Sequence, residues 1–256
     1  METANSLAAI TLNVRNPLKL AEFYCDTLGM VRFERNGEVA VGYGGQGAAL
    51  ILRSSSNISD YQHAQNHRYW KIAITLPNLD LAHDQLTKKG IDAPNPRQFR
   101  EIAYLTHITD PEGHIVELIQ HTFDGKPRDD EGDPVAPLGG GAQLGLITFR
   151  TDNIEREMVH CLEELGMSYL SRQPVADLGF DLYFFAFTKE KQPNPDVNAV
   201  TNREWLWQRP YTVLEFQHRL DGEKILHVEA PHSGAASVII QGTDKITPGV
   251  GKVILI

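Results

Sequence analysis

The stretch ITDPEGHIVELIQ, residues 108–120, decides the fold, because it joins a tight turn to a strand. The turn is DPEG, residues 110–113, whose residue types favour a reversal of the chain. In the strand that follows, side chains alternate between faces, so Glu117 shares one face with Ile115 and Ile119. A carboxylate on an otherwise apolar face needs a partner. Three partners remain open: a metal ion, a positively charged side chain, or water at the sheet edge.

The chain contains related units. ITLNVRN (10–16) and LGM (28–30) recur as ITFRTDN (147–153) and LGM (165–167) at the same offset. Two matches in one register indicate an internal duplication. A further unit begins with KIAITLPN (71–78). Each unit is interpreted as a strand, a helix and then three strands.

Residues 17–28 show why a helix is expected in each unit. Asn16 is a good N-cap, Pro17 suits the first helical position, and Gly29 suits the end. The units are expected over about 7–53, 68–121 and 144–219. A fourth begins near Lys224 and has too few residues left for a complete unit.

The sequence therefore predicts an α+β fold with two tandem domains. Residues 7–121 would form one domain from two units. Residues 122–143, rich in Gly, Pro and Asp, would be a linker. Residues 144–256 would form a second domain with an incomplete last unit.

Composition excludes several classes of function. The formal net charge of −9 gives no support for binding nucleic acid or an anionic membrane surface. No apolar run reaches the length of a membrane span, and METANSLAAITLNV does not resemble an export signal. The two cysteines, Cys25 and Cys161, are interpreted as small core residues rather than a disulfide scaffold. The expected location is the cytoplasm.

The paired βαβββ unit, with FY…LGM closing the first helix and DPEGHIVEL closing the second unit, resembles the vicinal oxygen chelate superfamily. That group contains glyoxalase I, bleomycin-resistance proteins and extradiol dioxygenases. The third unit is most similar to glyoxalase I, through LYFFAF (182–187) and TVLEFQH (212–218). The resemblance implies that paired units form curved mixed sheets around a cup. The cup usually holds a divalent metal bound by the first and last strands of each unit.

In the N-terminal half, most of the implied ligand positions hold residues that cannot bind a metal. Those of the first unit fall at Ala9 and within residues 50–52, which are apolar. Those of the second unit fall at Lys71 and Glu117. Lysine is cationic at neutral pH and a poor ligand. We therefore expect Lys71 and Glu117 to form an ion pair on adjacent strands, and no metal in the N-terminal domain.

In the C-terminal half, Glu215 matches the last-strand ligand position of glyoxalase I. The first-strand position, at or near Leu146, is not a ligand, and Ser237 stands where the next unit would supply a histidine. Two interpretations remain open. A divalent metal (zinc, iron, nickel or manganese) is bound near Glu215 by residues from the set His227, Glu229 and His232. Alternatively, these are surface or edge residues of a truncated unit.

Aromatic side chains suggest a ligand pocket formed by Trp205, Trp207 and Tyr104. The two tryptophans lie in an insertion of the third unit, where strand alternation would put both on one face. The alternative is that they pack over the sheet or across a dimer interface. His107 and His121 are candidates for the wall of the first cup, and histidine is a common acid–base group.

Three functions remain open. The first is a glyoxalase- or dioxygenase-like enzyme that acts on a small oxygenated or aromatic molecule, with the usual metal site degenerate. The second is a metal-free binding protein of the bleomycin-resistance type. The third is a metal-free enzyme with Glu117, Lys71, His107 and His121 as catalytic candidates. A homodimer is also expected, because an incomplete last unit leaves strand edges unpaired.

Overall fold

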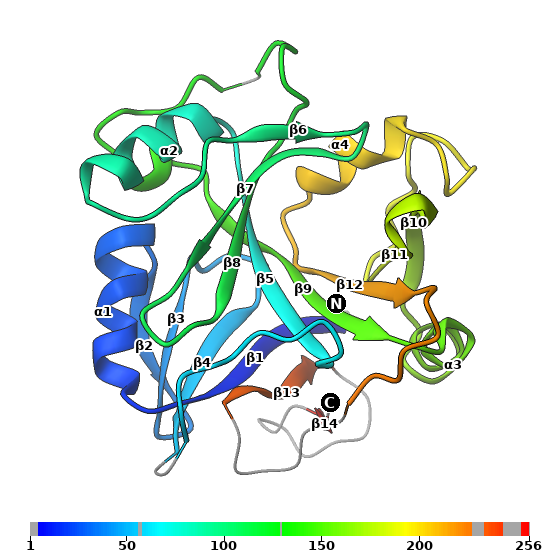
Figure 1. Ribbon diagram of the computed structural model, residues 1–256, viewed down its shortest axis with the longest axis horizontal. Coiled ribbons are helices and arrows are strands. Elements are labelled where there is room, and N and C mark those ends of the chain that lie inside the picture. The colour runs from blue at the N-terminus through cyan, green and yellow to red at the C-terminus, as the bar shows by residue number, and fades with distance from the viewer. Residues whose placement is uncertain (1–4, 56–57, 129, 227–232, 243–251, 256) are drawn as a thin grey trace.

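The computed structural model describes residues 5–55, 58–128, 130–226, 233–242 and 252–255 (Figure 1). The first module consists of β1 (Ser6–Val14), α1 (Pro17–Leu28), β2 (Val31–Arg35), β3 (Glu38–Gly42) and β4 (Ala49–Ser54). The second consists of β5 (Tyr69–Leu76), α2 (Leu79–Lys88), β6 (Arg97–Phe99), β7 (Ala103–Thr109) and β8 (Ile115–Gln120). A short turn of helix, η1 (Pro137–Gly139), precedes the third module.

The third module carries an extra helix. It consists of β9 (Gln143–Thr151), α3 (Ile154–Val159), the π-turn η2 (His160–Glu164), β10 (Ser168–Val175), η3 (Ala176–Leu178), β11 (Phe180–Ala186), α4 (Thr201–Trp207) and β12 (Val213–Arg219). After it come β13 (Gly234–Gln241) and β14 (Lys252–Leu255). The predicted α+β class and its βαβββ modules are confirmed, whereas the incomplete fourth module stays a prediction.

Local sequence signals explain where the helices begin. The side chains of Asn16, Asn78 and Asn153 each accept the backbone N–H three residues on, at 3.2, 3.0 and 3.0 Å. Each asparagine thereby satisfies a donor that the first turn of a helix leaves unpaired. Gly29 ends α1 with a φ of 75°, a conformation that glycine adopts without strain.

The two sheets combine modules from both halves of the chain. The eight-stranded sheet, of order β10-β11-β12-β9-β5-β8-β7-β6, joins the second and third modules through the antiparallel pair β5–β9. The six-stranded sheet, of order β14-β13-β1-β4-β3-β2, joins the first module to β13. The sequence predicts that the first two modules pair around one cup. That pairing is wrong.

The reason lies in the free edges of the first strands. In each module the first strand pairs in parallel with the last, as β1–β4, β5–β8 and β9–β12. The other edge of each first strand needs a partner, because unpaired backbone groups are unfavourable. The local sequence pattern does not indicate which other strand pairs with this edge. The order of strands in the sheets does not test the predicted linker at residues 122–143, which stays a prediction.

The eight-stranded sheet curls into a half-barrel that α4 closes. Its edge strands are β6 and β10, and α4, yellow in Figure 1, lies between them. The side chain of Arg203 donates to the carbonyl of Glu101, and Trp207 Nε1 donates to the carbonyl of Ile102 at 2.9 Å. One apolar cluster fills the concave face beneath α4, and a larger one lies between the sheets and the other helices. The half-barrel is therefore a cup with a closed end.

No helix in the described ranges is long and apolar enough to cross a membrane.

Candidate active site

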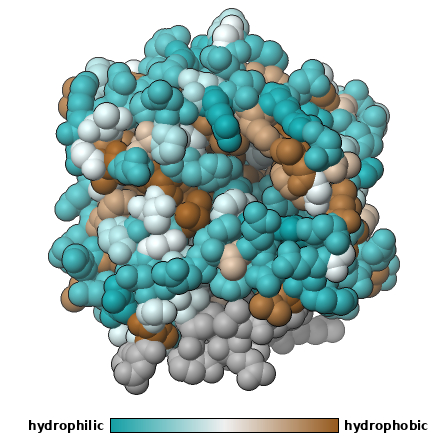
Figure 2. Space-filling model, viewed as in Figure 1, coloured by the Kyte–Doolittle hydropathy of each residue, from teal (hydrophilic) through white to brown (hydrophobic). Residues whose placement is uncertain are grey.

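A cavity of about 290 Å³ occupies the concave face of the eight-stranded sheet. Its apolar wall includes Phe99, Phe180, Leu182 and Trp207. Its polar lining residues are Lys71, Arg97, His107, Glu117, Glu215 and Gln217. In Figure 2 the surface of the molecule is largely hydrophilic, with hydrophobic side chains visible toward its recessed middle. An apolar hollow with a few convergent polar groups is typical of a small-molecule site.

Three charged side chains meet in this cavity. Lys71 Nζ lies 2.6 Å from Glu117 Oε2 and 3.3 Å from Glu215 Oε2. The exposed fractions of Lys71, Glu117 and Glu215 are only 5%, 5% and 3%. The predicted Lys71–Glu117 ion pair is confirmed. The second carboxylate, Glu215, was not predicted to join it, because it belongs to the other half of the chain.

Strand register explains why these side chains converge. Lys71 on β5 is opposite Thr148 on β9, and Thr148 is opposite Glu215 on β12. Residues opposite one another in a sheet point to the same face. Thr148 Oγ1 donates to Glu215 Oε2 at 2.5 Å and lies 3.3 Å from Lys71 Nζ. Glu117 reaches Lys71 from β8, the other neighbour of β5.

The charges of the cluster favour its ionised form. Burial opposes the charge of Glu117, but the Lys71 ammonium and the hydrogen bond from His107 outweigh it and lower the pKa of Glu117 to about 2. Burial likewise opposes the charge of Lys71, but Glu117 and Glu215 together raise the pKa of Lys71. These shifts favour the ammonium form of Lys71 and the carboxylate form of Glu117 at neutral pH.

The two carboxylates differ in what they offer a ligand. Glu117 has both oxygens occupied, Oε2 by Lys71 and Oε1 by His107 Nε2 at 3.0 Å. The contacts of Glu215 use only Oε2. Its Oε1 accepts no hydrogen bond from the described residues, and Glu215 lines the cavity. Glu215 is therefore the carboxylate with an oxygen available to a bound molecule.

The residues of this cluster do not fit a divalent metal. The ammonium of Lys71 lies between the two carboxylates, where a metal would require a ligand instead of a positive charge. Across the described ranges, no three His, Cys, Asp or Glu side chains are grouped so that they could hold a metal ion. On β1, the position at Ala9 packs in an apolar cluster with Ala49 and Ile51.

Trp70 is a cavity residue that the sequence does not predict, and Arg150 and His107 contact its ring. Trp70 lines the cavity, although alternation from Lys71 would turn Trp70 away. The pairing of β5 with β9 is irregular at this point, which reorients the side chain. The Arg150 guanidinium lies 4.2 Å from the Trp70 ring centre, and the His107 ring stacks 6.2 Å away. Burial lowers the pKa of Arg150 to about 10. No sequence signal marks such a bulge.

The other predicted site residues are dispersed. Trp205 and Trp207 do not share a face, because the insertion is the helix α4 and not a strand. Trp207 is buried in the cup, whereas Trp205 stacks against Arg209, 4.4 Å from the guanidinium, and does not line the cavity. Tyr104 faces away from the cup, and its hydroxyl donates to Asp80 at 2.7 Å. Trp207 alone of the three lies at the site.

Of the two predicted histidines that the structure describes, one lines the cavity and the other does not. His107 is at the site. His121 lies one residue beyond β8, its carbonyl accepts a hydrogen bond from Gln208 at 3.3 Å, and it is not among the described residues that line the cavity. His227 and His232 fall outside the described residues.

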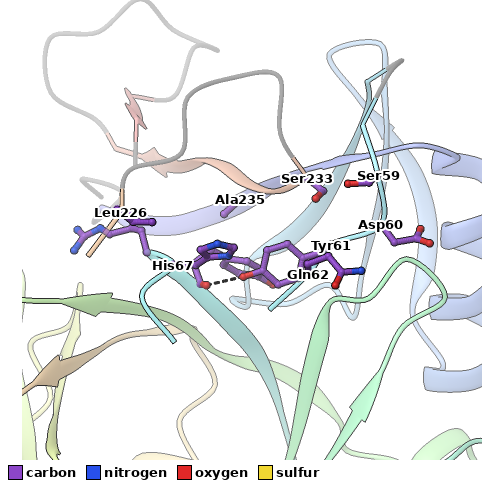
Figure 3. Close-up of a pocket in the computed structure, with 10 residues that line it drawn as sticks. Ser59, Asp60, Tyr61, Gln62, His67, Leu226, Ser233 and Ala235 are labelled. Carbon is purple, nitrogen blue, oxygen red and sulfur yellow. Dashed lines mark hydrogen bonds between the residues drawn. The ribbon is translucent and has the colours of Figure 1, made fainter. Parts of the chain in front are cut away.

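A second cavity, of about 200 Å³, is lined in part by Leu226 and Ser233 (Figure 3). Tyr61 and His67 also line it. The Tyr61 hydroxyl donates to the carbonyl of Tyr69 at 2.8 Å and is thereby engaged within the protein. Glu215 does not line this cavity.

A family model and solved structures both show similarity to glyoxalase-like proteins. A sequence model of the Glyoxalase/Bleomycin resistance protein/Dioxygenase superfamily matches residues 6–118. No curated protein matches the chain. Glyoxalase I from Zea mays superposes with a TM-score of 0.65 at 16% identity, covering 93% of this chain and 74% of that chain. A putative dioxygenase from Bacillus subtilis superposes with a TM-score of 0.51 at 14% identity, covering 87% and 66%.

Proposed function

Because residues 6–118 belong to the Glyoxalase/Bleomycin resistance protein/Dioxygenase superfamily and the chain has a glyoxalase I-like fold, we propose that it is an enzyme of metal-free acid–base chemistry. Its substrate would be a small molecule with an apolar or aromatic body and an oxygen-bearing head. The body would occupy the cup of the second and third modules, and the head would meet the Lys71–Glu117–Glu215 cluster.

The single observation that carries the proposal is the ammonium of Lys71 between two buried carboxylates. A positive charge at this point can stabilise negative charge that develops on an oxygen of the ligand, as a metal would in other enzymes. It does so without a metal ligand set. The metal predicted near Glu215 is therefore not part of the proposal.

Glu215 is the proposed base. Its Oε1 would take a proton from a carbon next to a carbonyl group of the substrate. The electron pair of the broken C–H bond would move toward the carbonyl oxygen, whose developing charge the Lys71 ammonium would stabilise. Return of the proton to another atom would give an isomer, so all atoms balance and no oxidant is consumed. His107, whose side chain is partly exposed and bonded to Glu117, would pass protons between the ligand and water.

Replacing Glu215 with glutamine is the test of this role. The amide keeps the shape of the side chain but cannot accept the proton, so we expect turnover to fall by about a hundredfold or more. Binding, measured by the rise in melting temperature and by tryptophan fluorescence, should change far less. Ligands would be found by screening small aromatic and aliphatic carbonyl compounds in these two assays.

Glu163→Gln is the matched control, because Glu163 is exposed and does not line the cavity. It should leave turnover and binding unchanged. Turnover that survives in Glu215→Gln at the level of the control would contradict the proposed base.

A second candidate function is binding without turnover. The observation that favours it is that Lys71 contacts both carboxylates. These charged groups then interact with one another instead of with a substrate. In that case ligands would raise the melting temperature but would be recovered unchanged after long incubation with the wild-type protein.

A further inference from the structure

Arg150 is a buried positive charge beside the cup. Its exposed fraction is only 3%, and it forms no ion pair with the residues that the structure describes. The guanidinium donates to Gln217 Oε1 at 2.8 Å, to the carbonyl of Ala64 at 3.0 Å and to His63 Nε2 at 2.9 Å. All three acceptors are neutral, because burial and the nearby guanidinium lower the pKa of His63 to about 4. These contacts leave the buried charge of Arg150 without an opposite charge, which is unfavourable.

Arg150 also fixes the direction of the Gln217 side chain, which lines the cup. A guanidinium can only donate hydrogen bonds, so the amide oxygen of Gln217 must face Arg150. The amide nitrogen is then on the other side of the group, and it donates to no acceptor in the described ranges. Trp70, which lines the cup as well, lies 4.2 Å from the same guanidinium. This wall therefore offers two N–H donors to a ligand, with a positive charge directly behind them.

Arg97 adds a second positive charge to the cup. It is exposed and lines the cavity from β6, where it is opposite Leu105 of β7, another lining residue. The two acidic lining residues already share the ammonium of Lys71. The side chain of Arg97, in contrast, forms no ion pair or hydrogen bond within the described part of the chain. Its charge is therefore available to a bound molecule.

Gln217 and Arg97 lie toward the open side of the cup. Glu215 is opposite Phe184, whose ring packs against Trp207 of α4 at 5.6 Å, so Glu215 is near the closed end. Gln217 lies two residues farther along β12 on the same face, or about 7 Å along the strand. A ligand can therefore reach Glu215 with one end while its other end meets the donors at the opening.

We propose that the open side of the cup binds a carboxylate, so that the substrate is a small organic acid. The inference rests on the proposed function, because it names the class of molecule whose carbonyl group reaches Lys71. The amide N–H groups of Gln217 donate to the carboxylate, and Arg97 supplies an opposite charge. Arg150 is a positioning residue that holds Gln217 and stabilises the anion from behind. A neutral ligand of the same shape would leave both cations without an opposite charge.

Binding of acids and their methyl esters tests the proposal without any turnover. The probes are benzoate, 3-phenylpropanoate and 3-benzoylpropanoate, each compared with its own ester by tryptophan fluorescence and melting temperature. At least one acid should bind the wild type about tenfold more tightly than its ester, because only the acid gains charge-assisted hydrogen bonds. Gln217→Glu replaces the donors with a negative charge. It should abolish this preference and leave ester binding unchanged within about threefold.

Two further readouts separate ligand binding from a structural role. In Gln217→Glu the new carboxylate faces the guanidinium of Arg150, so the melting temperature without ligand should be at least that of the wild type. Arg97→Gln, at an exposed position, should weaken binding of the acid by about fivefold and leave the ester unchanged. Arg32→Gln is its matched control, because Arg32 is exposed on β2 and does not line the cavity. It should change neither affinity.

A panel in which no acid binds more tightly than its ester would overturn the proposal. So would a preference for the acid that survives in both Gln217→Glu and Arg97→Gln. The proposed base is decided separately, by turnover in Glu215→Gln. The affinities of acid and ester do not depend on that turnover, so the failure of one proposal is distinguishable from the failure of the other.

Discussion

Lys71→Met should lower the free energy of unfolding by about 3–5 kcal/mol. The substitution removes the ammonium that lies 2.6 Å from Glu117 and 3.3 Å from Glu215. Two buried carboxylates would then be left without their shared cation, and such an uncompensated charge costs far more than the intact pair contributes. Urea unfolding of the wild type and the variant at neutral pH measures the difference.

A neutral version of the cluster separates charge from packing. In the triple variant Lys71→Met, Glu117→Gln, Glu215→Gln, no member of the cluster is charged, so most of the lost stability should return. The volume change at Lys71 is the same in both variants. A single variant as stable as the wild type, or a triple variant no better than the single, would show that the charges do not control stability here.

Asp110→Ala is the second substitution with a large expected effect, a loss of about 3 kcal/mol or more in the free energy of unfolding. Asp110 is buried in the turn that precedes β8. Its Oδ1 accepts the backbone N–H groups of Glu112 and His114 at 2.9 and 3.0 Å. Its Oδ2 accepts the Tyr24 hydroxyl at 2.9 Å. Alanine would leave these buried donors without a partner.

Asp92→Ala is the matched control, because Asp92 is exposed. It should change the free energy of unfolding by less than about 0.5 kcal/mol. Equal losses in the two variants, measured by urea unfolding, would contradict the role given to the Asp110 network.

The Asp110 turn also explains the structural role of the stretch ITDPEGHIVELIQ, residues 108–120. Glu112 Oε2 and Oε1 accept the backbone N–H groups of Arg15 and Asn16 at 2.7 and 2.8 Å, at the start of α1. With the Tyr24–Asp110 hydrogen bond, the turn therefore fastens the second module to the helix of the first. At Gly113, φ is 95° and a Cβ would lie 2.2 Å from the carbonyl oxygen of Tyr61, so only glycine fits.

Features set by local sequence could be predicted. The helices begin at Asn16 and Asn153 because an asparagine cap acts on the residues beside it. The Lys71–Glu117 pair is expected from the family resemblance, which places both residues on adjacent strands of one module, and β5 and β8 are neighbours. Both predictions needed only residues of the same module.

Features that depend on contacts between distant parts of the chain could not be predicted from the sequence. Glu215 joins Lys71 because β5 pairs with β9, a choice between free edges that no local pattern encodes. Trp70 enters the cavity through an irregularity in that same pairing. A strand period predicts that Trp205 and Trp207 share one face, but the segment forms a helix, where residues two apart point in different directions.

The metal content of the protein, purified without chelator, tests most directly the claim that Lys71 takes the place of a metal in this cup. Mass spectrometry of the wild type, Glu117→Ala and Glu215→Ala should find no stoichiometric metal in the wild type and no difference between the three proteins. About one metal ion per chain in the wild type, lost in Glu215→Ala, would contradict the account.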